Sequence, residues 1–130
     1  MSLTLRRVAL GVYLACVATA LLWPGIVLPD APIERPDLVA HAGMFGLLTL
    51  LMVGARVGGS PTLGVRNVAV GGLVSLALAS GLEAAQGIPG INRSSGLDDG
   101  LANALGVALV SGALGVIGVV DRSKRRDGQG

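Results

Sequence analysis

Residues 101–120 read LANALGVALVSGALGVIGVV, a run without a single charged side chain. A helix rises about 1.5 Å per residue, so about 20 such residues cross the hydrocarbon core of a bilayer, which is roughly 30 Å thick. Alanine, leucine and glycine dominate the run, and apolar and polar residues do not alternate with the period of a strand. The stretch therefore predicts a transmembrane helix.

Three further apolar runs precede it, at residues 8–28, 38–55 and 68–82. The third reaches spanning length only if residues 83–85 belong to it, which places Glu83 near the polar interface. Lipid leaves no water for unpaired backbone groups, and this favours helices over an open sheet. We predict a single-domain, all-α membrane protein, a four-transmembrane-helix bundle with helices at about 6–28, 37–56, 66–86 and 97–120 and a mobile tail at 121–130.

The overall composition excludes two other classes of protein. Of the 130 residues, 52% are hydrophobic and 14% are charged, and the mean hydropathy is +0.71. A soluble domain carries about 25% charged residues, and a disordered chain combines low hydrophobicity with high net charge. Cys16 is the single cysteine, so an intrachain disulfide is excluded as well.

The basic residues predict how the bundle is oriented. Short cytoplasmic loops are enriched in lysine and arginine. One end of the predicted bundle carries eight basic residues, namely Arg6, Arg7, Arg56, Arg66, Arg122, Lys124, Arg125 and Arg126. The other end carries only Arg35 and Arg93, so both termini are predicted to be cytoplasmic. The high pI of about 9.3 then reflects contacts with the lipid bilayer, and we expect no nucleic-acid partner, because no basic patch is interleaved with aromatic residues.

Polar side chains gather at the opposite, acidic end of the predicted bundle. Three helices each carry two polar residues three or four positions apart, a spacing that puts both on one helix face. The pairs are Asp37 and His41, Glu83 and Gln86, and Asp99 and Asn103. Ionisable residues at membrane depth are costly and suggest function. With Arg93, these seven residues are predicted to line one polar, ligand-binding pocket that opens outward.

The same residues form an ordered pattern. It reads Asp37-x3-His41-x3-Phe45, Glu83-x2-Gln86 and Arg93-x5-Asp99-x3-Asn103-x2-Gly106. Over residues 37–106 this pattern resembles the VanZ-like family of small bacterial membrane proteins, and the first helix matches only as an apolar span. Two features differ: Leu38 stands where the family commonly has a lysine, and residues 88–91 lack the aromatic that is common there.

The resemblance implies a multi-pass protein of the bacterial plasma membrane, linked to glycopeptide (teicoplanin) resistance. It fits a pocket on the extracytoplasmic side that binds a lipid-linked wall precursor or a lipoglycopeptide. In this hypothesis Arg93 pairs with a phosphate or carboxylate, and Gln86 and Asn103 supply neutral hydrogen bonds. Cofactor, metal and oligomeric state stay open.

Two alternatives stay open beside this hypothesis. The first is a membrane-surface enzyme, a hydrolase or transferase on lipid-linked substrates. There, His41 would be a general base oriented by Asp37, and Glu83 or Asp99 an acid or metal ligand, although their spacing matches no local metal motif. The second is a structural or accessory membrane subunit whose polar residues only join helices, packed through small-residue motifs such as Ala102-x3-Gly106.

Overall fold

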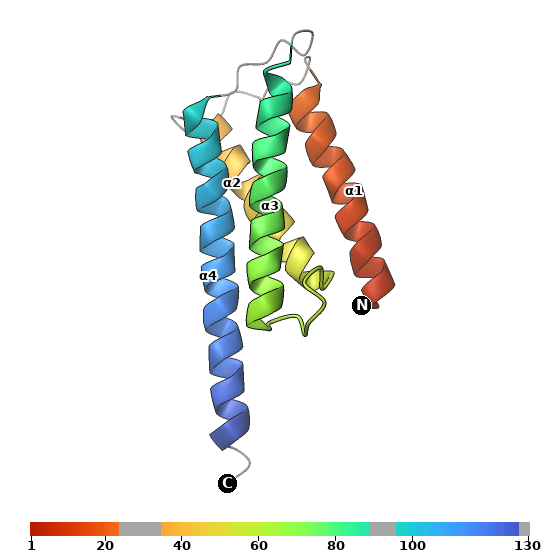
Figure 1. The fold of residues 1–130 in the computed structure, drawn as a ribbon, viewed down its shortest axis with the longest axis vertical. Helices are drawn as coiled ribbons and strands as arrows, with labels where there is room; N and C mark the ends of the chain where they lie inside the picture. Colours follow the sequence, from red (N-terminus) through yellow and green to blue (C-terminus); the bar gives the residue numbers. More distant parts are fainter. Residues whose placement is uncertain (24–34, 89–95, 128–130) are drawn as a thin grey trace.

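The computed structural model describes residues 1–23, 35–88 and 96–127 (Figure 1). These residues form four α-helices and no strand: α1 (Leu3–Leu22), α2 (Pro36–Gly54), α3 (Val65–Gln86) and α4 (Leu97–Asp127). All four helices are long and apolar enough to cross a membrane. The predicted all-α, four-helix membrane fold is confirmed.

The first helix is shorter than the predicted range 6–28. It begins at Leu3, where the Ser2 hydroxyl accepts a 3.2 Å hydrogen bond from the Leu5 amide and caps the helix. It ends at Leu22, and Trp23 is extended. Trp23 precedes Pro24, whose ring disfavours the helical conformation of the residue before it. The prediction followed apolarity and overlooked this proline.

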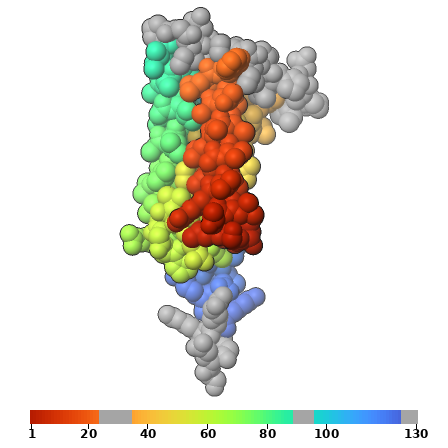
Figure 2. All heavy atoms as spheres, turned by 90° about the vertical axis from the view of Figure 1, so that its right-hand side faces the viewer, coloured from red at the N-terminus to blue at the C-terminus, as the bar shows by residue number. Residues whose placement is uncertain are grey.

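The fourth helix is longer than predicted. It continues to Asp127, so residues 121–127 of the predicted tail are helical, while residues 128–130 lie outside the described part. Charged residues end a membrane span, but lysine and arginine are good helix formers. Arg122 also donates a 3.0 Å hydrogen bond to the Gly118 carbonyl. Figure 2 shows this end of α4 protruding beyond the other helices.

The middle helices keep close to their predicted ranges. The second ends at Gly54, two residues earlier than predicted, and Arg56 just beyond it has a positive φ of 57° that no helix can continue. The connection to α3 is held by Asn67, which is fully buried. Its side chain accepts from the Gly58 amide at 2.8 Å and donates to the Val53 carbonyl at 2.7 Å. Sequence analysis had not singled out Asn67 or these hydrogen bonds.

Helices α2 and α4 form the most extensive contact in the bundle. A Cβ atom at Gly106 would overlap the Ala42 carbonyl oxygen, and one at Gly46 would lie 3.2 Å from a Val110 methyl group. The two backbones therefore touch through small residues, as expected for helices in lipid. Among the described residues, α1 packs only against α2 and α3.

The start of α1 and the end of α4 lie at one end of the bundle, with the α2–α3 connection (Figure 1). The opposite end brings together the C-terminal ends of α1 and α3 and the N-terminal ends of α2 and α4. The predicted polar pairs of α2, α3 and α4 are therefore level with one another, as the topology requires.

Candidate functional site

Three polar side chains from three helices form one hydrogen-bonded chain, which we call the polar bridge: His41 of α2, Asn103 of α4 and Glu83 of α3. The His41 Nδ1 lies 3.0 Å from the Asn103 Oδ1. The Asn103 Nδ2 donates to the Glu83 Oε1 at 2.6 Å. Asn103 is buried, and His41 and Glu83 are partly buried. The bridge brings together three of the seven predicted site residues.

The orientation of Asn103 determines which ring nitrogen of His41 donates to it. An ionised carboxylate only accepts hydrogen bonds, so the Asn103 amide nitrogen faces Glu83 and its oxygen faces His41. The His41 Nδ1 must then carry a proton and donate it to this oxygen. In the neutral ring the other nitrogen, Nε2, is an acceptor. The bridge therefore sets the tautomer of the only histidine in the chain.

Gly100 has no side chain and so leaves room for the Glu83 carboxylate to lie against α4. A Cβ atom at Gly100 would lie 3.0 Å from the Glu83 Oε2. Asp99 also lies near enough to Glu83 for its negative charge to act on the Glu83 carboxylate. Glu83 thus joins the polar bridge beside a like charge.

Two of the predicted site residues form hydrogen bonds at helix ends and do not belong to the polar bridge. The Gln86 Nε2 donates to the Leu21 carbonyl at 2.9 Å, which ties α3 to the end of α1, while its buried Oε1 has no hydrogen-bond partner among the described residues. The Asp99 carboxylate accepts from the Gly96 amide at 3.2 Å and caps its own helix. Glu83 and Gln86 therefore share one face of α3 but contact two different helices, α4 and α1.

Asp37 belongs to a cluster of ion pairs that sequence analysis missed. The Arg35 guanidinium lies 3.5 Å from the Asp37 carboxylate and 3.4 Å from that of Asp98. This cluster joins the N-terminal ends of α2 and α4. The hydrogen bond from Arg35 to Asp37 raises the pKa of the guanidinium above its usual value, so Arg35 stays positively charged. The sequence did contain a signal for the position of Arg35, because Arg35 directly precedes Pro36, a residue typical of the first turn of a helix.

The predicted catalytic set does not meet as a triad. Asn103, rather than Asp37, hydrogen-bonds His41, and Asp99 is turned to its own helix cap. In the described ranges no three histidine, cysteine or acidic side chains lie close enough together to hold a metal ion. Arg93, the remaining predicted site residue, lies outside the described residues.

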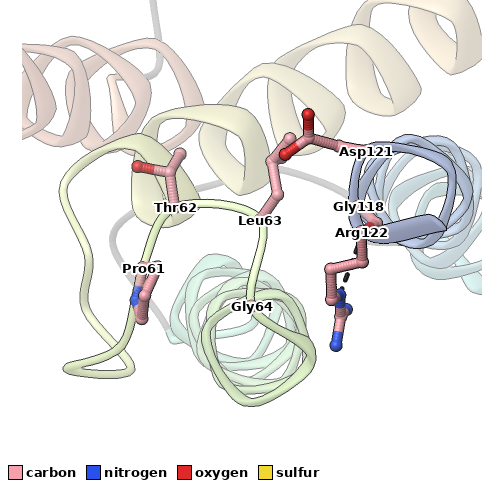
Figure 3. Close-up of a pocket in the computed structure, with 7 residues that line it drawn as sticks. All are labelled: Pro61, Thr62, Leu63, Gly64, Gly118, Asp121 and Arg122. Atoms are coloured by element: carbon pink, nitrogen blue, oxygen red, sulfur yellow. Dashed lines mark hydrogen bonds between the residues drawn. The ribbon is translucent and has the colours of Figure 1, made fainter. Parts of the chain in front are cut away.

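Two pockets lie beside α4, and the polar bridge lines neither of them. The first, of about 530 Å³, lies between the α2–α3 connection and the C-terminal half of α4, where Arg122 and Asp121 approach Leu63 and Gly64 (Figure 3). The second, of about 360 Å³, is a groove between α2 and α4 at the opposite end of the bundle. We call it the α2–α4 groove; it is lined by Leu38, Val39, Ala42, Asp98, Leu101, Ala102 and Leu105.

No family model, curated protein or solved structure matches this chain. The resemblance noted above therefore depends on its motif residues alone. Besides the polar bridge, these include Phe45, which is fully buried in the core, and Gly106, which lies against the backbone of α2. The motif thus combines residues of the polar bridge with residues that hold α2 against α4.

Proposed function

We propose that this chain is a VanZ-like protein of the bacterial plasma membrane whose polar bridge binds the headgroup of a cell-envelope amphiphile, either a lipid-linked wall precursor or a lipoglycopeptide. One observation supports the proposal above all. Three helices contribute His41, Asn103 and Glu83 to a single hydrogen-bonded chain near one end of the bundle.

The depth of the bridge supports binding at the headgroup level. His41 lies five residues after the start of α2 and Asn103 six after the start of α4, about 8–9 Å along each helix. Neutral polar residues would suffice to join helices there. The bridge instead includes two ionisable groups, which are costly at this depth and can meet a charged headgroup.

The sidedness of the bridge is part of the proposal. The excess of lysine and arginine at the end that holds the start of α1 and the end of α4 favours a cytoplasmic location for that end. The polar bridge then lies on the extracytoplasmic side, where wall precursors and glycopeptide antibiotics meet the membrane. Arg93, in the connection before α4, would supply a positive charge for a phosphate or carboxylate.

The test is the susceptibility of a teicoplanin-sensitive host that expresses the chain. The native chain is expected to raise the inhibitory concentration of teicoplanin, and Glu83→Gln is expected to abolish this protection. Glutamine keeps the length of the side chain and an oxygen for Asn103 but removes the charge. Asp121→Asn, the same change at the opposite end, is the control and should protect like the native chain. Lack of protection by the native chain, at a membrane level matched by immunoblot, would contradict the link to resistance.

A second candidate is a membrane-surface hydrolase or transferase. The observation that favours it is the fixed tautomer of His41, which leaves Nε2 as an acceptor suited to general-base catalysis. Phosphate or acyl release from lipid-linked substrates by the reconstituted chain, lost in His41→Gln, would support an enzyme. Absence of turnover together with measurable lipid binding would favour the binding protein.

A further inference from the structure

The α2–α4 groove is an apolar channel with a charged mouth. Its α4 wall consists of Asp98, Leu101, Ala102 and Leu105, whose i, i+3, i+4, i+7 spacing puts them on one stripe along the helix. From Asp98 to Leu105 this stripe is about 10 Å long. Only Asp98, at the helix end, is polar. The groove therefore has a charged rim at the end of the helix and an apolar lining along the rest of its length.

The rim carries both signs of charge. Arg35 contacts Asp98, which lines the groove, and also Asp37, the neighbour of the groove residue Leu38. One guanidinium between two carboxylates leaves one negative charge in excess. All three side chains are about half exposed, and their N···O distances of 3.4–3.5 Å exceed the roughly 2.7–2.9 Å of a tight charge-assisted hydrogen bond. These exposed contacts are weak enough to be replaced by those of a ligand.

We infer that the α2–α4 groove binds one phospholipid with a zwitterionic, primary-ammonium headgroup, of the phosphatidylethanolamine type. Its phosphate contacts the Arg35 guanidinium, its ammonium donates to the Asp98 and Asp37 carboxylates, and an acyl chain follows the groove along Leu101 and Leu105. This site is separate from the polar bridge, which does not line the groove. The inference does not depend on the proposed function.

Charge complementarity selects this headgroup among common phospholipids. An anionic glycerol headgroup satisfies Arg35 but offers no cation to the excess carboxylate. A choline headgroup carries a cation, but its methyl groups leave it no N–H to donate. A primary ammonium provides three N–H donors for two carboxylates, and the adjacent phosphate provides acceptors for Arg35. In this headgroup the phosphate lies between the ammonium and the acyl chains, and at the rim one guanidinium lies between two carboxylates, so each headgroup charge meets a group of opposite sign beside the apolar groove.

The test is native mass spectrometry of the full chain, delipidated in detergent and titrated separately with dioleoyl phosphatidylethanolamine, phosphatidylcholine and phosphatidylglycerol. The ethanolamine lipid is expected to bind with the lowest Kd. Asp98→Asn is expected to weaken its binding about tenfold and to leave the glycerol lipid unchanged. Val39→Trp, at an exposed groove position, should fill the channel and weaken binding of all three lipids.

Leu73→Trp is the matched control, because Leu73 is an exposed residue of α3 outside the groove, and it should bind lipid like the native chain. Equal affinity for the three lipids overturns the headgroup assignment. Equal binding by Val39→Trp and Leu73→Trp overturns the groove as the site. A dimer that binds no lipid, seen in the same spectra, would show that a second copy covers the groove. Thermal melts of each variant confirm that the exposed substitutions leave the fold intact.

Discussion

Asn103 donates a 2.6 Å hydrogen bond to Glu83 while its oxygen faces His41, so one buried amide joins three helices. Asparagine suits this position because it offers a donor and an acceptor on one short side chain. A carboxylate there would repel Glu83, and an apolar residue would leave both partners unpaired. The amide is therefore the residue on which the polar bridge depends.

Asn103→Leu should destabilise the bundle by about 1–3 kcal/mol, because His41 and Glu83 both lose their partner in a poorly hydrated place. The measurement is the free energy of unfolding in mixed micelles. Ser75→Ala is the control, since Ser75 is buried but hydrogen-bonds the Gly71 carbonyl of its own helix. Equal stability of the two variants would show that the bridge contributes nothing to the fold.

Gly106→Ala should strongly destabilise the packing of α2 on α4, because the new methyl group overlaps the Ala42 carbonyl. Gly112→Ala, on the same helix, has open space and should be neutral or stabilising by up to about 1 kcal/mol. Denaturant midpoints of the two variants provide the comparison. The prediction fails if both alanines shift the midpoint in the same direction by similar amounts.

Asn67→Leu should loosen the α2–α3 connection, since the Gly58 amide and the Val53 and Thr62 carbonyls lose their partner. Faster amide exchange at residues 55–64, with unchanged exchange in α4, is the expected result. Hydrogen exchange followed by mass spectrometry measures it. Uniformly faster exchange in all helices would instead mean that Asn67 supports the whole fold.

The orientation predicted from the basic residues can be measured by cysteine labelling in a Cys16→Ser background, because Cys16 is itself exposed. A membrane-impermeant maleimide applied to intact cells should label Gly87→Cys and should not label Ser123→Cys. Permeabilised cells should give labelling at both positions. Labelling of Ser123→Cys alone in intact cells would invert the proposed sidedness and put the polar bridge in the cytoplasm.

Elements and their order could be predicted from the sequence because the bilayer imposes a length and a polarity on every span. Four charge-free runs separated by short charged segments predict four helices that cross the bilayer in alternating directions. The residues at which the helices end were predicted less accurately. Pro24 stops α1 through its backbone chemistry, whereas the charged residues after Val120 end the span without ending α4.

The partners of the polar residues were decided only by the tertiary structure. Spacing shows that Glu83 and Gln86 share a face, but not that one reaches Asn103 and the other reaches Leu21 on α1. The rotation of each helix follows from packing, above all from the contact of Gly106 with α2, and this packing depends on side-chain shape across helices. The amino-acid sequence alone therefore determined which end of the bundle is polar, and the close packing of α2, α3 and α4 determined which of its residues form the polar bridge.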